Sequence, residues 1–209
     1  MTAIGGCMPA WSPEIANEFI RLSAADRRAF DQLQLQALVY IAHGWRLAGC
    51  DQPLTGDRPE AWAFGPVYRR IADALAPYGE DPVHREIGAG APLGVRFQSE
   101  LDQSETDLIE EIYHTHGRFE SWQLATLTSC DGAPWSVIYA GGRGEFRDIP
   151  HRLIRSQFVD LRKPIEGVRS AMSSNPRRGS EIERHKIDLD EPLKSLGTYK
   201  VASEVDWGR

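Results

Sequence analysis

His43 and Cys50 are the first residues whose types could carry catalysis, because a cysteine thiolate beside a histidine base is a nucleophile. Such a nucleophile needs its base within hydrogen-bond reach and a third group that orients the base. The two residues are seven positions apart, on one predicted helix or with Cys50 just past its end, and this spacing is roughly 10 Å along the helix axis. This spacing favours a histidine bonded to backbone or water and a small packed cysteine, and it leaves a Cys/His hydrolase as the weaker alternative.

Two further patterns suggest metal or phosphate chemistry. His114 and His116 are two residues apart, which places them on different faces of a helix, and the sequence offers no obvious third metal ligand. Gly141–Gly144 is rich in glycine but lacks the Lys-Ser/Thr pair of a phosphate-binding loop. We therefore expect polar residues at a helix end, a solvent loop, and no metal or other cofactor.

The charge balance bears on nucleic acid as a partner. The chain of 209 residues has a formal net charge of −6 and a sequence pI of about 5.5, whereas nucleic-acid binding usually shows a basic surface. One small basic cluster is diluted by acids; it comprises Arg177, Arg178, Arg184 and Lys186, with Glu181 and Glu183 between them. The balance disfavours nucleic acid, and a DNA-binding transcriptional regulator remains an alternative because a helical core permits a helix-turn-helix.

Cysteine usage and hydropathy bear on the compartment. Three widely spaced cysteines without a Cys-x-x-Cys pair indicate neither a disulfide framework nor a zinc site, and they favour a reducing cytoplasm. No apolar run approaches the roughly 20 residues that span a bilayer. The first residues lack the basic start and apolar run of a signal peptide. We expect a cytoplasmic protein without a membrane partner.

Helical periodicity dominates the first part of the chain. Ser12-Pro13 predicts a helix start, with the serine as N-cap and the proline at the first helical position. The next helix ends at Gly49 and carries one apolar face, formed by Leu35, Leu38, Val39, Ala42 and Trp45. Residues 60–64 predict a short strand or an extended hook. Gly65-Pro66 predicts a break followed at once by a helix that Pro77 ends.

The second part predicts shorter helices. Residues 79–100 are rich in Gly and Pro and predict an irregular connector, with at most a short strand near 95–97. A helix should start at Ser104, with Asp107 as its capping partner, and a turn should follow at His114–Arg118. Ser121 should cap a further short helix, and Pro134-Trp135 should open another turn of helix. Ile149-Pro150 should open a last helix, which buries Leu153, Ile154, Phe158 and Leu161. Residues 198–202 could add a strand.

Together these patterns predict a mainly α fold, a compact single-domain helical bundle with a short β-hairpin or extended segments. We expect a flexible leader over residues 1–11, the helical domain over 12–162, and a polar C-terminal extension over 163–209.

Three blocks with their spacing resemble the Panacea antitoxin-domain family, which includes SocA-like antitoxins and phage-associated GepA-like proteins. The first block runs from Leu33 to Trp45 and ends in Ala-His-Gly-Trp, and the second, Glu60–Val67, is similar to the family's Glu-Ala-Trp-x-Tyr-Gly-Pro-Val. A weaker third block is Trp122–Thr128 with Pro134-Trp135. The resemblance covers about residues 13–160. The family often has lysine where this chain has Gln34 and Ala37, and histidine where it has Ser129.

The resemblance implies a non-enzymatic antitoxin that neutralises a cognate protein toxin by direct contact. In the SocA-like branch it further implies a proteolytic adaptor that delivers the toxin to the ClpXP protease. Trp and Tyr are common anchors of protein interfaces, although any one of them is more often a core residue. The predicted partner-binding residues lie in the first two blocks and the residue after them: Tyr40, His43, Trp45, Trp62, Phe64 and Tyr68.

Overall fold

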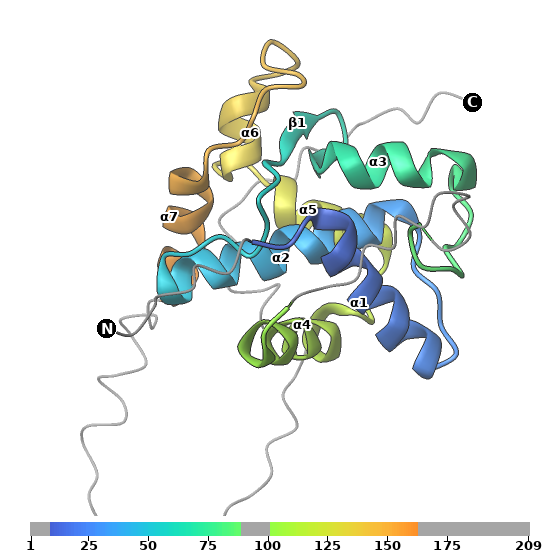
Figure 1. Ribbon diagram of the computed structural model, residues 1–209. Helices are drawn as coiled ribbons and strands as arrows, with labels where there is room; N and C mark the ends of the chain where they lie inside the picture. Colours follow the sequence, from blue (N-terminus) through green and yellow to red (C-terminus); the bar gives the residue numbers. More distant parts are fainter. Residues whose placement is uncertain (1–8, 89–100, 163–209) are drawn as a thin grey trace, which may run out of the picture. The chain divides into compact units, whose positions relative to one another are not determined.

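The computed structural model describes residues 9–88 and 101–162, which form seven α-helices, one 3-10 turn and one two-stranded antiparallel hairpin. This confirms the prediction of a mainly α fold with a short hairpin (Figure 1). The chain divides into two units, Met1–Val159 and Asp160–Arg209. The site below and all the elements belong to the first unit, except residues 160–162 at the end of the last helix. The basic cluster at 177–186 and the strands expected near 95–97 and 198–202 lie outside the described residues.

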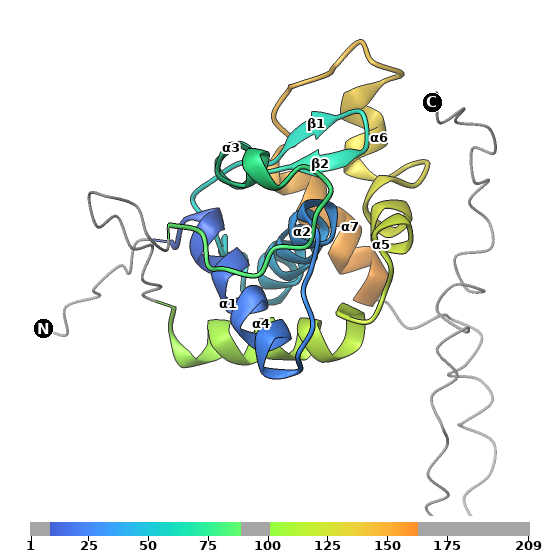
Figure 2. The same cartoon turned by 90° about the vertical axis from the view of Figure 1, so that its right-hand side faces the viewer.

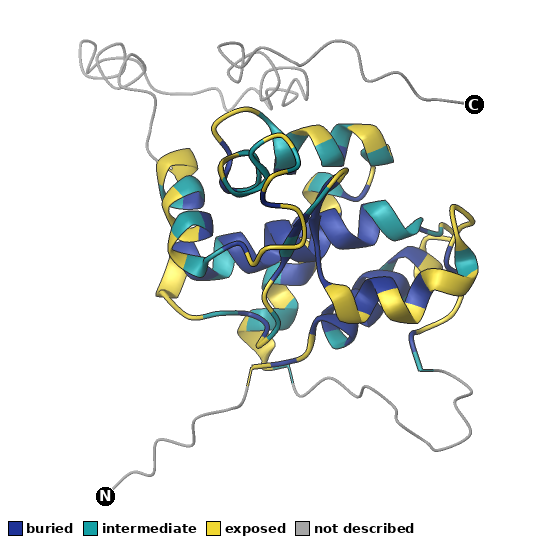
Figure 3. Ribbon diagram, turned by 90° about the horizontal axis from the view of Figure 1, so that it is seen from above, coloured by how far each residue is buried: buried dark blue, intermediate teal, exposed yellow. Residues whose placement is uncertain are grey.

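Helix α2 (Gln32–Cys50) forms the centre of the first unit. It is buried on all sides, with 13 of its 19 residues buried, rather than on the single face that its periodicity predicts. Contacts from α1, α3, α4, α5 and the hairpin surround it, and Figure 3 shows it as a dark blue core element. Asp31 caps its start together with Gln34, and the helix ends one residue beyond the predicted Gly49, with Asp51 in the left-handed conformation.

Helix α1 (Ser12–Ala25) starts one residue before the predicted Pro13 and has a different cap. Trp11 occupies the N-cap position, and its backbone N–H donates to the carboxylate of Glu14 at 2.8 Å. Ser12 was predicted to be the cap, but its N–H and hydroxyl both donate to Asp57 from the segment before the hairpin. Ser12 therefore bonds to a residue distant in the sequence instead of capping the helix.

The hairpin consists of β1 (Glu60–Trp62) and β2 (Gly65–Val67), with Ala61 opposite Pro66 in the register. The prediction that Gly65-Pro66 opens a helix is wrong, because helix α3 (Arg69–Leu75) begins only after Tyr68. The Gln36 side chain of α2 explains the difference. Its amide donates to the Tyr68 carbonyl at 3.2 Å and accepts from the Tyr68 N–H at 2.8 Å, which holds the chain extended up to that residue.

The remaining helices follow the predicted order with shifted ends. After the 3-10 turn Ala76–Tyr78, the elements are α4 (Gln103–His116), α5 (Ser121–Ser129), α6 (Pro134–Tyr139) and α7 (His151–Arg162). The N-cap of α4 is Asp102 with Glu105, not Ser104 with Asp107. The N-cap of α5 is Glu120, not the predicted Ser121. The turn predicted from His114 begins only at Gly117, because α4 continues through His116.

Helix α7 buries less than its sequence suggests. Ile154 and Phe158 are buried, whereas Leu153 is half-buried and Leu161 is exposed, which corrects the prediction for Leu161. A Cβ added to Gly44 in α2 would overlap the Phe158 ring, so this glycine allows α7 to approach α2 closely. Across the described parts of the chain, no helix has the length and apolar character of a membrane span.

The loop after α6 completes the surroundings of the hairpin. The Ala61 N–H donates to the Arg147 carbonyl at 2.9 Å, and the Phe146 N–H donates to the Ala61 carbonyl at 2.8 Å. Ile149 continues this pairing by donating to Pro59 at 2.7 Å. Residues 146–149 therefore run beside β1, and Figures 1 and 2 both show α6 next to the hairpin.

Candidate partner-binding surface

Three of the six predicted partner-binding residues are core residues. Tyr40, His43 and Tyr68 are each 0% exposed. Trp45 and Trp62 are half-buried, and Phe64 is 58% exposed. A side chain without exposed surface offers nothing for a partner to contact, so we revise the predicted surface and leave the three buried residues out of it.

The buried residues form an aromatic cluster around His43. Its ring lies 4.7 Å from that of His151 and 6.4 Å from that of Tyr68, and its Nδ1 accepts a long hydrogen bond of 3.4 Å from the Thr55 N–H. Burial, with a smaller contribution from His151, lowers the pKa of His43 to about 3. Burial also raises the pKa of Tyr68 well above its ordinary value. These groups are therefore neutral at physiological pH, as buried core side chains should be.

The structure separates the two residues of the hydrolase alternative. His43 is fully buried, whereas Cys50 is exposed and its Sγ donates to the Arg46 carbonyl of the same helix at 3.2 Å. His114 and His116 lie on the last turn of α4. Among the residues that the structure describes, no three His, Cys, Asp or Glu side chains gather as metal ligands.

An exposed aromatic and aliphatic group surrounds the hairpin instead. We call it the hairpin surface, and it consists of Trp62, Phe64, Trp135, Val137, Tyr139 and Phe146. Phe64, Val137 and Phe146 are 58%, 59% and 55% exposed. Phe64 lies in the hairpin turn, Val137 on α6, and Phe146 in the loop beside β1.

Trp62 is the best-anchored member of the hairpin surface. Its indole Nε1 donates to Glu60 at 2.9 Å, and the Arg69 guanidinium lies 5.2 Å from the centre of its ring. Arg69 also binds Glu60 through two hydrogen bonds of 2.9 and 2.7 Å. Burial alone would raise the pKa of Glu60, but the bonds from Arg69 and Trp62 outweigh it and lower that pKa.

Helix α6 is joined to the hairpin through Trp135. The Nε1 of Trp135 donates to the Trp62 carbonyl at 2.8 Å, and its ring stacks on Tyr139 with centres 4.7 Å apart and planes 14° apart. Both indole N–H groups at this site thus have partners, while part of each ring stays accessible. Such a combination of a satisfied polar group and an open aromatic face is typical of interface anchors.

Phe146 is held in an unusual backbone conformation. Its φ of +62° lies in the left-handed region, where a residue other than glycine is strained. Its ring lies 5.3 Å from that of Trp62 in an edge-on arrangement. A large apolar side chain that is both exposed and strained suggests a functional role rather than a contribution to stability.

A shallow cavity of about 360 Å³ lies between α6 and the loop that follows it. Its apolar part comes from α6 and its C-cap, and its charged part from the following loop; the residues concerned are Val137, Ile138, Ala140, Arg143, Arg147 and Asp148. Arg58 lies 3.7 Å from the Asp148 carboxylate. The cavity thus combines an aliphatic floor with arginines at its edge.

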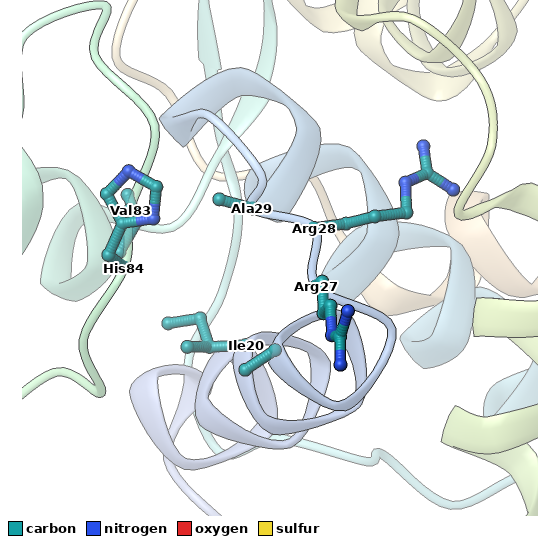
Figure 4. Close-up of a pocket in the computed structure, with 7 residues that line it drawn as sticks. Ile20, Arg27, Arg28, Ala29, Val83 and His84 are labelled. Atoms are coloured by element: carbon teal, nitrogen blue, oxygen red, sulfur yellow. The ribbon is translucent and has the colours of Figure 1, made fainter.

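A second cavity, of about 320 Å³, lies between the end of α1 and residues 83–84. Figure 4 shows Val83 and His84 on one side of it and Arg27 and Arg28 on the other, with the Arg28 side chain pointing away from Val83 and His84. The carbonyl end of α1 contributes negative partial charge beside these arginines, which itself accounts for basic residues there. We therefore do not assign this cavity to the candidate site.

The sequence indicated Trp62 and Phe64 but not Val137 or Phe146. Phe146 lies in a segment where Gly141–Gly144 predicted only a solvent loop. A large aromatic residue directly after such a loop indicates a binding surface only weakly. Phe146 lies on this surface because its backbone pairs with β1, and no local sequence pattern predicts that pairing.

The sequence of this chain is similar to those of known antitoxins. The family model described as "Antitoxin SocA-like, Panacea domain" matches residues 35–136, from α2 to the first part of α6. The antitoxin SocA of Caulobacter vibrioides (strain NA1000 / CB15N) is 31% identical over 132 residues, which cover 61% of this chain and 69% of that protein. No solved structure matches.

Proposed function

Because this chain belongs to the family of SocA-like antitoxins with a Panacea domain, we propose that it is an antitoxin that binds a cognate protein toxin directly and thereby neutralises it. The observation that supports this most is the hairpin surface. It presents exposed apolar side chains beside two tryptophans whose indole N–H groups both have hydrogen-bond partners. Exposed apolar groups of this kind mark protein-interaction sites more often than chance.

The framework supports binding because it limits the entropy lost on association. Trp62 is fixed by Glu60, Arg69 and Phe146 together, and Trp135 is fixed by the Trp62 carbonyl. Each rotamer-rich side chain that must be immobilised on binding costs about 0.5–1.5 kcal/mol. Rings that are already held avoid most of that cost, so these residues can act as anchors for the toxin.

The first experiment co-expresses this protein with the product of the neighbouring open reading frame. We expect the neighbour to inhibit growth alone, to be harmless beside this protein, and to co-purify with it. A neighbour that is harmless alone and does not co-purify would contradict the proposal.

The second experiment locates the contact on the hairpin surface. Phe64→Asp should abolish co-purification and protection while the purified variant keeps its helical circular dichroism, because a carboxylate would have to be buried unpaired in the interface. Trp11→Ala provides the matched control, since it removes a half-exposed aromatic residue at the start of α1, outside the hairpin surface. Protection by Phe64→Asp equal to wild type would exclude the hairpin turn from the interface.

We further propose that the bound toxin is delivered to the ClpXP protease, as the SocA-like resemblance implies. An adaptor needs a second contact that stays free when the toxin is bound, so the two roles should be separable by mutation. In a reconstituted reaction, adding this protein should shorten the half-life of the toxin with ClpXP and ATP. An unchanged half-life would leave direct neutralisation as the whole mechanism.

A further inference from the structure

We propose that the cavity between α6 and the loop after it binds an apolar side chain of the toxin together with an adjoining carboxylate, so that the contacted segment is both apolar and acidic. This inference rests on the proposed function, because the occupant is the toxin. It adds the chemistry of the occupant and assigns its recognition to Arg143 and Arg147. We define these two residues as the arginine rim.

The floor of the cavity suits an aliphatic or aromatic side chain. Val137 and Ile138 from α6, with Ala140 at its C-cap, supply the apolar part. Val137 is more than half exposed, although the same helix buries Pro134. An apolar group entering here would remove Val137 from water, and burial of apolar surface contributes roughly 25 cal/mol per Å².

The arginine rim supplies positive charge that no carboxylate of the described residues 9–88 and 101–162 pairs with. Among the described residues, neither Arg143 nor Arg147 has a carboxylate within salt-bridge distance. Of the nearby acids, Asp148 faces Arg58 at 3.7 Å, and Glu145 is exposed and is not part of the lining. A guanidinium group pairs best with a carboxylate, through two parallel hydrogen bonds.

The backbone of this loop is set before any partner arrives. Ala140 and Phe146 both have left-handed φ angles, of +48° and +62°. The Gly144 N–H donates to the Tyr139 carbonyl at 3.0 Å, and a Cβ at Gly144 would overlap the carbonyl of Ile138. The loop therefore folds back closely on α6, which keeps the arginine rim next to the apolar floor.

The position of the rim in the sequence points to a role in partner choice. The family match ends at residue 136, so the floor from Val137 onward, Phe146 and the arginine rim lie beyond it. The hairpin with Trp62 lies inside the matched range. If family members share the hairpin but differ in the charged residues beside it, the same fold can recognise different toxins. Complementary charge mainly determines specificity and association rate.

Phosphate is the other anion that arginine pairs bind, so DNA is the competing occupant. The aliphatic floor favours the protein segment, because a phosphate backbone offers nothing to cover Val137. The same variants can decide between the two, since toxin binding and binding of promoter DNA are measured separately.

The test measures the dissociation constant of the full chain and the purified toxin by calorimetry. Arg143→Glu with Arg147→Glu should weaken binding by roughly tenfold or more, because two attractive charges become repulsive. Raising the salt concentration from about 50 to about 300 mM should weaken wild-type binding, and this dependence should shrink or reverse in the double variant. Arg27→Glu with Arg28→Glu is the matched control, with the same change in net charge at the other cavity.

Each outcome has a defined meaning. If the rim variant binds like wild type while Phe64→Asp loses binding, this inference fails and the proposed function stands. Equal weakening by the rim variant and the Arg27/Arg28 control would show an effect of overall charge and would also overturn it. Loss of promoter-DNA binding with unchanged toxin binding would assign the rim to DNA. If wild-type protein binds no toxin, the proposed function fails and this inference with it.

Discussion

Replacing Phe146 by glycine and by alanine gives a direct test of the strained loop. Both substitutions remove the ring and its contact with Trp62, so that loss cancels when the two variants are compared. What remains is the backbone conformation at φ +62°. In most folded contexts alanine is favoured over glycine, because glycine loses more conformational entropy on folding.

The magnitude follows from two opposing terms. The entropy of glycine costs about 0.5–1 kcal/mol relative to alanine. A left-handed conformation costs alanine roughly 1–2 kcal/mol and costs glycine almost nothing. With the observed φ at Phe146 the second term is larger, so Phe146→Gly should be more stable than Phe146→Ala by roughly 0.5–1 kcal/mol.

Urea unfolding of both variants, followed by circular dichroism, measures this difference. Glu110, an exposed residue inside α4, is the control position, where alanine should be more stable than glycine by about 1 kcal/mol. Phe146→Ala equal to or more stable than Phe146→Gly would refute the left-handed conformation in solution. The loop around Phe146 would then not be held in its binding conformation before the toxin arrives. Both variants should weaken toxin binding equally, since both lose the ring.

Three further predictions concern stability. Arg27→Gly should raise the free energy of unfolding by about 1 kcal/mol, because Arg27 has a left-handed φ of +57° just after α1; a lower melting temperature for this variant would contradict the conformation. Gly44→Ala should lower the free energy of unfolding by about 1–3 kcal/mol, because the new methyl group would overlap Phe158. Gly49→Ala in the same helix meets no atom within 4 Å and should be stabilising. Urea unfolding of the two variants tests this, and equal effects would refute the close approach of α7 to α2. The pKa of His43 in the folded protein is about 3, below its value of about 6.5 in the unfolded chain. Only the unfolded chain gains a proton at this residue as the pH falls from about 6.5 towards 3, so the free energy of unfolding should decrease by at most about 1.4 kcal/mol per pH unit. Urea unfolding at several pH values should show a shallower decrease for His43→Gln than for the wild type. An equal decrease in both would refute the lowered pKa of His43.

Local patterns predicted the helices well and the hairpin incompletely. The end of α2 within one residue of Gly49 and the burial of Ile154 and Phe158 follow from stop signals and periodicity, which act within a few residues. The second strand was missed because its conformation depends on Gln36, which lies 32 residues before Tyr68. Proline after glycine is compatible with a helix start, and only that buried amide selects the strand.

The candidate site likewise contains residues that local sequence patterns predict and residues that they do not. Trp62 and Phe64 could be found in the sequence because aromatic residues in a short extended segment are an interface signal in themselves. Phe146 could not, because it joins the hairpin through backbone pairing with Ala61, far away in the chain. Val137 could not either, because α6 is linked to the hairpin through the bond from Trp135 to the Trp62 carbonyl. The burial of Tyr40 and His43 was also hidden, since it depends on how many elements surround α2.

The buried aromatic residues and the hairpin surface therefore have different physical roles, and mutation should separate them. Gln36 and Tyr68 hold the hairpin against α2, so changes there should reduce toxin binding only in proportion to the loss of folded protein. Phe64 and the arginine rim contribute little to the core, so changes there should reduce binding while the unfolding curve stays nearly the same. A Gln36→Ala variant that stays fully folded yet fails to bind would contradict this division, because it would give a buried framework residue a direct part in recognition.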